Sequence, residues 1–306
     1  MIHHYKSIPL DKATPYLSHC IDGIHTYCVE TYNNKAYSQS LIEKFDKITE
    51  GNIKGFILVD PEDHPQAMVW VEVLTRNHGS LIIYAQNHMA EIEAIERLME
   101  SKLAKGCLLE LITFTPSLNI QDQLRQVGAI ENYRQRMAVF LQENTFEPFQ
   151  TQYKITPLGD QSVETTTELS VAAHLVSEDY KGYDGLINMD KRRTLQNDIM
   201  SNKFGPYNES ASCALMDGAT MIGFCCYVDI ENWGEPVVPW IFDICVHPDF
   251  HGLGYGAGLL NYSLQILKEQ NLKYAGLAVT NDNYSAWGLY QKMGFSFVEY
   301  FYEYVF

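Results

Sequence analysis

Four glycines alternate along the segment VHPDFHGLGYGAGLL, between an apolar run and a stretch with apolar residues at helical spacing. Because Gly252, Gly254, Gly256 and Gly258 lack a Cβ, the backbone N–H groups of this segment can point into one concavity. A helix that begins directly afterwards adds the positive end of its dipole. The pattern predicts a site for a pyrophosphate-sized anion, built from backbone amides, rather than a purely structural turn.

Two common nucleotide-binding loops fit these glycines poorly. Gly252, Gly254 and Ala257 match the Gly-x-Gly-x-x-Ala fingerprint of a dinucleotide-binding fold. However, the residues PDFH separate the glycines from the preceding strand, and no acidic residue ends the next strand. The chain after the loop is also too short for the rest of a doubly wound sheet. The Gly-Lys-Ser/Thr sequence of a Walker loop does not occur.

Two segments of the chain resemble the motifs of the GCN5-related N-acetyltransferases, the GNAT family. His251 to Gly256 is similar to the acetyl-CoA-binding motif of that family, Arg/Gln-x-x-Gly-x-Gly/Ala after a strand. The segment NDNYSAWGLYQKMGF resembles the family's Asn-x-x-Ala-x-x-Leu-Tyr-x-Lys-x-Gly-Phe, carried by Asn283, Ala286, Leu289, Tyr290, Lys292, Gly294 and Phe295. The resemblance is strong over residues 236–306 and extends more weakly back to about residue 153.

The sequence departs from the family pattern at His251, where Arg or Gln is usual. No arginine occurs after Arg193. We therefore expect the pyrophosphate to bind mainly to backbone N–H groups rather than to a cationic side chain.

The resemblance implies a transferase that moves an acetyl group from acetyl-CoA, its co-substrate, to a primary amine by direct attack in a ternary complex. Tyr290 occupies the position of the family's general acid, which protonates the leaving thiolate. By the same resemblance the residues that bind acetyl-CoA are Ile244, Val246, His251, Gly252, Leu253, Gly254, Tyr255, Gly256, Ala257 and Asn283. No metal is expected, because the cysteines form no Cys-x-x-Cys pair and His247 and His251 lie in a turn with a proline.

Asp243 is the candidate general base, because it is a carboxylate within the apolar strand WIFDICV. Burial would raise its pKa toward a useful value, and a water molecule could relay the proton. A solvent-facing Asp243 on a half-exposed strand is an equal alternative. The acceptor is expected between residues 177–185 and 229–236. Acidic and aromatic side chains at 177–185 suit a cationic small molecule or protein amine, although this segment also reads as a solvated loop.

The elements that must position these residues form an α/β domain with a mixed sheet. Apolar periodicity and turn residues predict its helices near 163–178, 190–202, 254–269 and 284–293. The same patterns predict its strands near 153–158, 212–216, 221–230, 237–247, 273–280 and 295–306.

A faint internal repeat relates the two halves of the chain. LRQVGAIENYRQRMAVF resembles YQKMGFSFVEYFYEYVF and places Gly128 opposite Gly294, an offset of 294 − 128 = 166 residues. We therefore expect two tandem GNAT domains, a degenerate one over 1–145 and an active one over 150–306. The first half has no glycine loop at the matching place, and Leu124 stands at the position of Tyr290.

The composition of the chain argues against binding to polyanions. The chain has 306 residues, with 38 acidic and 22 basic side chains and a formal net charge of −16. This balance disfavours binding to nucleic acid or to an anionic membrane. Seven cysteines without a Cys-x-x-Cys pair favour reduced thiols in a cytoplasmic protein. We expect no signal peptide or membrane span, and a monomer or weak homodimer.

Two other functions remain open from the sequence. One is a CoA-binding sensor module without catalysis, which the presence of Tyr290 and Asn283 disfavours. The other is an acyl or aminoacyl transferase on the same fold.

Overall fold

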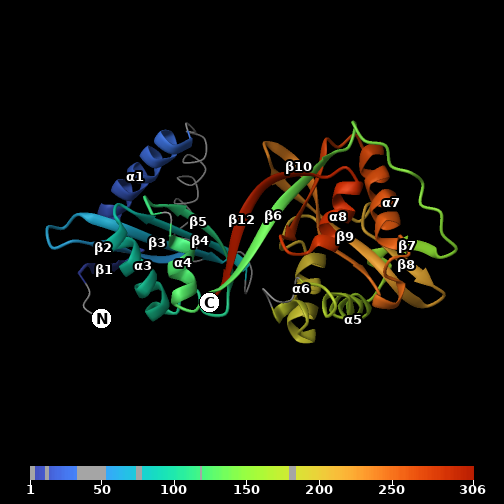
Figure 1. The fold of residues 1–306 in the computed structure, drawn as a ribbon, viewed down its shortest axis with the longest axis horizontal. Helices are drawn as coiled ribbons and strands as arrows, with labels where there is room; N and C mark the ends of the chain where they lie inside the picture. Colours follow the sequence, from blue (N-terminus) through green and yellow to red (C-terminus); the bar gives the residue numbers. More distant parts are fainter. Residues whose placement is uncertain (1–3, 11–13, 33–52, 74–77, 118, 179–183) are drawn as a thin grey trace. The chain divides into compact units, whose positions relative to one another are not determined.

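The computed structural model describes residues 4–10, 14–32, 53–73, 78–117, 119–178 and 184–306 (Figure 1). Packing divides the chain into two compact units. Unit 1 consists of Met1–Asn132 and Tyr302–Phe306, and unit 2 consists of Tyr133–Phe301. Each unit is a mixed sheet with helices on both faces, so the predicted α/β class with a mixed sheet is confirmed.

The sheet of unit 1 has the strand order β1-β2-β3-β4-β5-β12. Neighbouring strands are antiparallel except for β4 and β5, which are parallel. The elements of this half are β1 (Lys6–Pro9), α1 (Thr14–Tyr32), β2 (Ile53–Val59), β3 (Pro65–Val73), β4 (His78–Ala85), α3 (His88–Ser101), β5 (Leu108–Phe114) and α4 (Ile120–Gln126).

Helices cover both faces of the sheet in unit 1. Helix α1 buries Cys20, Ile24 and Cys28 against one face. Helices α3 and α4 bury apolar side chains such as Ile95 and Leu124 against the other. Alternating inward side chains on the strands supply both cores, which is the pattern of a sheet buried on two sides.

The sheet of unit 2 has the order β6-β11-β10-β9-β8-β7, again with one parallel pair, β10 and β11. Its elements are β6 (Ile130–Phe140), β7 (Lys154–Pro157), α5 (Val163–His174), α6 (Met189–Met200), β8 (Cys213–Asp217), β9 (Thr220–Asn232), β10 (Glu235–Val246), α7 (Tyr255–Glu269), β11 (Tyr274–Thr280), α8 (Tyr284–Lys292) and β12 (Ser296–Val305). The elements predicted for residues 153–306 therefore all form.

The two faces of the sheet in unit 2 are also covered. Helices α7 and α8 pack on one face, where Leu260, Leu264 and Tyr290 are buried. Helices α5 and α6 pack on the other, where Leu169 and Ile199 are buried. The two halves thus repeat one architecture, and β5 and β11 begin 274 − 108 = 166 residues apart, as the sequence repeat predicts.

The two halves exchange their last strands. Strand β6 follows α4 along the chain but pairs with β11 in unit 2, from Arg134 opposite Thr280 to Phe140 opposite Tyr274. The end of β12 pairs with β5 in unit 1, where Tyr304 lies opposite Leu109. The compact units therefore do not follow the expected linear boundary between residues 145 and 150.

Two further features bear on the sequence expectations. All seven cysteines are buried and free. Among the helices that the structure describes, none has the length and apolar character needed to span a membrane.

Candidate active site

The two parallel strands of unit 2 part near their middle. Strand β10 pairs with β11 only at Trp240 opposite Gly276 and Ile241 opposite Leu277. Beyond Ile241, β10 continues to Val246 beside β9 but without β11. The sheet therefore opens between the second half of β10 and the end of β11.

A β-bulge lies where the strands part. Ile241 is opposite Tyr227 and Asp243 is opposite Cys226, so Phe242 is an extra residue in β10. Ile241 packs with the core under α7 and α8, whereas Phe242 packs with the core under α5 and α6. A bulge bends its strand and increases the local twist, which accounts for the separation of β10 from β11.

The register of β10 fixes where its backbone polar groups point. The N–H of His247 donates to the carbonyl of Ile222 at 2.9 Å. Because hydrogen-bonded positions alternate in an antiparallel pair, Cys245 also bonds to β9, whereas Ile244 and Val246 turn their polar groups to the opposite side. That side is the opening left by β11. The sequence analysis named these two residues among those that bind acetyl-CoA.

The glycine loop gives α7 an uncapped N-terminus. Gly254 precedes the helix with a φ of 84° and makes no side-chain cap. The N–H of Gly258 donates to the carbonyl of Gly254 at 2.9 Å. Within the described residues, the N–H groups of Gly252 through Ala257 have no hydrogen-bond acceptor. Such a row of free amides at a helix N-terminus matches the oxygens of a phosphate.

The side chain of His251 braces the loop against β10. Its Nε2 lies 2.7 Å from the carbonyl oxygen of Val246, so Nε2 carries the proton in this arrangement. This contact occupies the carbonyl of Val246. It leaves the Val246 N–H and the polar groups of Ile244 as the backbone groups that face the opening.

Helix α8 carries the second motif. Asn283 caps it, since the Asn283 Oδ1 accepts from the N–H of Ala286 at 3.1 Å. Tyr290 is only 6% exposed and packs edge-on against Phe295, with 5.8 Å between ring centroids. The structure thus gives Asn283 a helix-capping contact that its motif position alone did not reveal.

Asp243 lies at the centre of a buried polar network beneath the opening. One carboxylate oxygen contacts the guanidinium of Arg192 and accepts from Ser170 Oγ at 3.0 Å and Gln196 Nε2 at 3.2 Å. The other accepts from Cys245 Sγ at 3.2 Å and lies 3.5 Å from His174 Nε2. Helices α5 and α6 are thereby tied to β10 beside the bulge.

The expected rise in the pKa of Asp243 is wrong. Burial does raise the pKa of this carboxyl, but the charge of Arg192 and the nearby imidazole of His174 outweigh it and hold the pKa below its ordinary value. The surroundings of Asp243 therefore stabilise the carboxylate, which makes it a weak proton acceptor. The alternative of a solvent-facing Asp243 is wrong too, since the residue is 6% exposed.

His174, Asp243 and Cys245 also bring three potential metal ligands within 4.8 Å of one another, as the described residues show. Burial raises the pKa of the Cys245 thiol well above its ordinary value, and the charge of Asp243 raises it further. Because metals bind thiolates and Arg192 already neutralises Asp243, this cluster is better suited to a proton-bearing network than to a cation.

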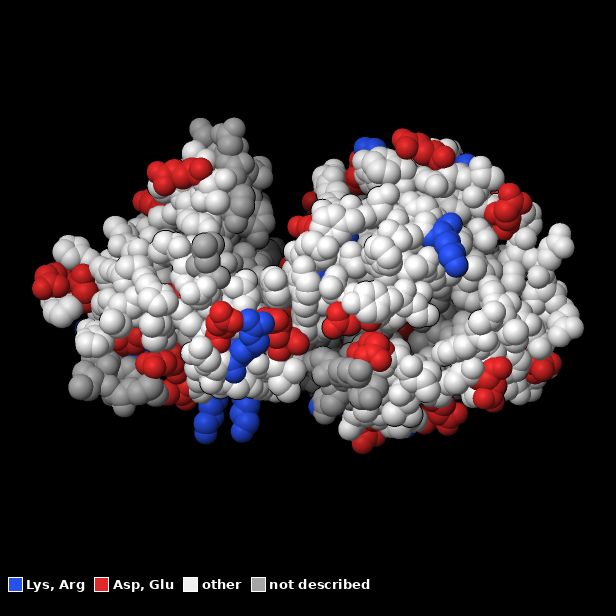
Figure 2. Space-filling view, viewed as in Figure 1, with Lys and Arg blue, Asp and Glu red and all other residues white. Residues whose placement is uncertain are grey.

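The expected acceptor segments are only partly described. Residues 179–183 of the segment 177–185 lie outside the described residues. In the segment 229–236, Asp229 accepts from Asn208 Nδ2 at 2.8 Å and Glu235 pairs with Lys273 at 2.7 Å. On the face of unit 2 that Figure 2 draws, acidic side chains are spread widely and basic ones are few.

Comparison with known proteins agrees with this geometry. The model of the acetyltransferase (GNAT) family matches residues 176–295, which include the opened strand, the glycine loop and α8. Residues 176–295 are therefore a GNAT domain. No curated protein sequence matches the chain.

Solved GNAT structures resemble the chain over almost its whole length. A GCN5-related N-acetyltransferase from Sphaerobacter thermophilus has a TM-score of 0.56 and 13% identity, covering 99% of this chain and 96% of that one. A tandem GNAT protein from the clavulanic acid biosynthesis pathway has a TM-score of 0.51 and 11% identity, covering 98% and 97%. At these identities the likeness concerns the fold. This likeness in fold confirms the predicted fold of two tandem GNAT domains.

Proposed function

We propose that unit 2 is an N-acetyltransferase that moves the acetyl group of acetyl-CoA to a primary amine in a ternary complex. The observation that carries the proposal is the parting of β10 and β11 after Ile241, next to the free amides of Gly252–Ala257. An extended chain that ends in a pyrophosphate matches both features. GNAT membership of residues 176–295 supports the same chemistry.

The backbone of β10 would hold the thioester arm. The N–H of Ile244 faces the opening and can donate to the thioester carbonyl, which gains negative charge as the amine attacks. The amides of the glycine loop would bind the pyrophosphate, so that each chain holds one acetyl-CoA. This placement orients the acetyl carbon for attack and keeps the carbonyl out of water.

The transfer then needs two proton movements. The amine nitrogen bonds to the acetyl carbon and the C–S bond breaks, so the nitrogen loses a proton and the sulfur leaves as a thiolate. Tyr290, on α8, is the proposed donor to the thiolate, because a phenol has a pKa close to that of the leaving thiol. The amine proton passes to water in this scheme, since Asp243 is held as a stabilised carboxylate.

The binding step is tested by calorimetric titration of acetyl-CoA into the wild-type chain and Gly254→Glu. The wild type should bind one acetyl-CoA per chain. The carboxylate in the variant should weaken binding by about a hundredfold or more, because it opposes the pyrophosphate within a few ångströms. Gly218→Glu is the matched control. Gly218 also has a positive φ, 59°, and open space around it, but it lies in the β8–β9 turn.

The transfer step is tested by thiol release from acetyl-CoA with a panel of cationic amines. Release that depends on the amine and falls in Tyr290→Phe supports the transferase. Binding without release for any amine would instead support a CoA-binding module. Stronger thermal stabilisation by longer acyl-CoAs than by acetyl-CoA would redirect the proposal to another acyl group. Absence of wild-type binding would refute the proposed site.

A further inference from the structure

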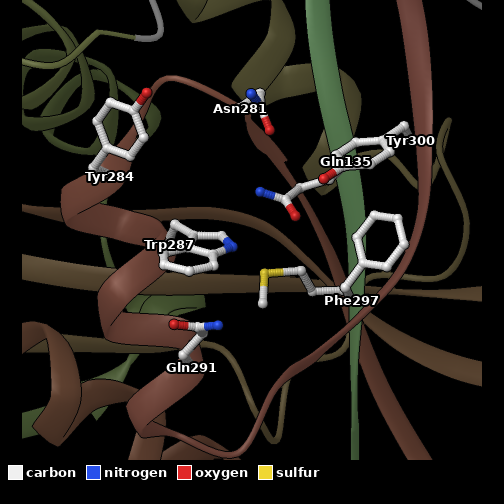
Figure 3. A pocket seen from close by; sticks show the side chains of 8 residues that line it. Gln135, Asn281, Tyr284, Trp287, Gln291, Phe297 and Tyr300 are labelled. Atoms are coloured by element: carbon white, nitrogen blue, oxygen red, sulfur yellow. The ribbon is translucent and has the colours of Figure 1, made fainter.

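A second concavity lies in unit 2 on the other side of α8. It has a volume of about 200 Å³ and is formed by one stripe of α8 together with β6, the end of β11 and β12 (Figure 3). Its lining residues are Gln135, Met137, Asn281, Tyr284, Trp287, Gln291, Phe297 and Tyr300.

This cavity shares no lining residue with the opening between β10 and β11. Tyr284, Trp287 and Gln291 follow one another at i, i+3 and i+7, which places them on one stripe of α8. Tyr290 lies off that stripe and is buried in the core under α7 and α8. The cavity is therefore separate from the proposed acetyl-CoA site, and its ligand does not depend on the function proposed above.

The floor of the cavity carries an amide that faces the cavity. Gln135 is 4% exposed, and its carboxamide points into the cavity (Figure 3). Within the described part of the chain, the side-chain amides of Gln135, Asn281 and Gln291 form no hydrogen bond. The amide nitrogen and oxygen of Gln135 are open to the cavity rather than enclosed in the core. A carboxamide both donates and accepts hydrogen bonds, so this amide is available to a polar group of a ligand.

The walls of the cavity are aromatic. Figure 3 shows the rings of Phe297 and Tyr300 across the cavity from Trp287, whose indole nitrogen points inward. The centroids of the Phe297 and Tyr300 rings lie 4.5 Å apart. Tyr284, Phe297 and Tyr300 remain 72%, 49% and 52% exposed, so large apolar faces stay open around a polar floor.

The chemistry of the lining selects the class of ligand. None of the eight lining residues carries a formal charge, which favours an uncharged ligand. Carboxamides both donate and accept, which matches hydroxyl groups, and aromatic faces match the C–H face of a saturated ring. The cavity is smaller than the 300–1,000 Å³ typical of drug-sized ligands. We propose that it binds a single uncharged pyranose ring, free or at the end of a larger glycoconjugate.

The proposal is tested by titrating methyl β-glucopyranoside into the full chain labelled with ¹⁵N-tryptophan. The indole signal of Trp287, assigned with Trp287→Phe, should shift and saturate in the millimolar range. Gln135→Leu should weaken binding at least about tenfold, because it removes the donor and acceptor on the cavity floor while keeping the side-chain size. Gln265→Leu is the matched control, since Gln265 lies on α7 and bonds only to Glu269.

Each outcome decides the proposal. Saturable binding that Gln135→Leu weakens and Gln265→Leu preserves supports it. Tighter binding of the disaccharide cellobiose than of the methyl glycoside would identify the end of a glycoconjugate as the source. Failure to saturate overturns the proposal, as does equal binding by Gln135→Leu. Preferential binding of adenosine at the same indole would overturn it in favour of a planar base. Acetyl-CoA titration of the same samples reports separately on the proposed transferase site.

Discussion

Strands β4 and β5 of unit 1 correspond to β10 and β11 of unit 2, but only the second pair opens. In unit 1 the parallel pairing is continuous from His78 opposite Leu108 to Tyr84 opposite Phe114. In unit 2 it ends at Ile241 opposite Leu277, where Phe242 is inserted as a bulge. Counting along the paired strands, Asp243 takes the place of Ile82, which is buried and apolar.

The helices that follow β4 and β10 also differ at their N-termini, which are closed by side chains in unit 1 and open in unit 2. Asn87 caps α3 by accepting from the N–H of Ala90 at 3.0 Å, and the buried Glu91 accepts from Gln123 on α4 at 2.8 Å. Gly254 leaves the start of α7 uncapped, and Gly258 stands at the place of Glu91. Acidic and capping side chains thus occupy in unit 1 the helix start that backbone amides expose in unit 2.

The comparison teaches that the fold alone does not make the site. From β2 in unit 1 and from β8 in unit 2, the described elements follow in the same order. Yet one extra strand residue and the loss of side chains from one loop separate an open arrangement from a closed one. The predictions below test those differences, from the largest expected effect to the smallest.

Removing the charge that supports the opened strand should have the largest effect. Arg192→Ala leaves the carboxylate of Asp243 buried without its cation, and we expect a loss of about 3–5 kcal/mol in the free energy of unfolding. Urea unfolding followed by tryptophan fluorescence measures it. Arg193→Ala is the adjacent control. Its pairs with Glu164 and Asp190 are exposed and screened by water, so their loss should change the stability much less. Equal losses in both variants would contradict a structural role for the network.

Deleting Phe242 should make β10 resemble β4. The strand would regain regular pairing, extend along β11 and close the opening, so we expect acetyl-CoA affinity to fall about a hundredfold. Calorimetry measures the binding, and circular dichroism checks that the fold persists. Phe242→Leu keeps the chain length and should retain binding. If the deletion variant bound acetyl-CoA normally, the bulge would not be the cause of the opening.

Gly258→Ala tests the close packing of Phe149 on Gly258, the residue that stands where unit 1 has Glu91. A Cβ at this position would lie 2.1 Å from the Phe149 ring, so the ring must move, and we expect a loss of about 1–3 kcal/mol in stability. Gly256→Ala is the control, because its Cβ would meet Leu289 Cδ2 at 3.4 Å. Thermal unfolding compares the two variants. No difference between them would show that Phe149 moves aside at little cost.

The pH dependence of stability should show the smallest effect. Since the folded pKa of Asp243 is depressed, its stabilisation is fully present above the unfolded value of about 3.9 and is lost as the pH falls toward the folded pKa. Asp243→Asn should therefore be less stable at neutral pH and should lose less stability on acidification below about pH 4. Unfolding curves at several pH values measure this. A parallel decline in both proteins would contradict the assignment.

Local signals predicted much of unit 2. Glycine spacing located the start of α7, apolar periodicity located its helices and strands, and the second motif located α8 with Asn283 and Tyr290. These predictions succeeded because capping, turns and amphipathic spacing depend on residues close together in the chain. The bulge at Phe242 left no comparable signal, since WIFDICV reads as one continuous apolar strand.

The sequence by itself therefore determined the elements, their repeat and the free amides of the loop, all of which follow from local backbone chemistry. Only the tertiary structure decided the exchange of β6 and β12, because strand partners are chosen over long distances in the chain. It also reversed the expected direction of the Asp243 pKa, because Arg192 lies 51 residues away in the chain. The free amide of Gln135 likewise became visible only when β6, α8 and β12 came together, since a cavity exists only between packed elements.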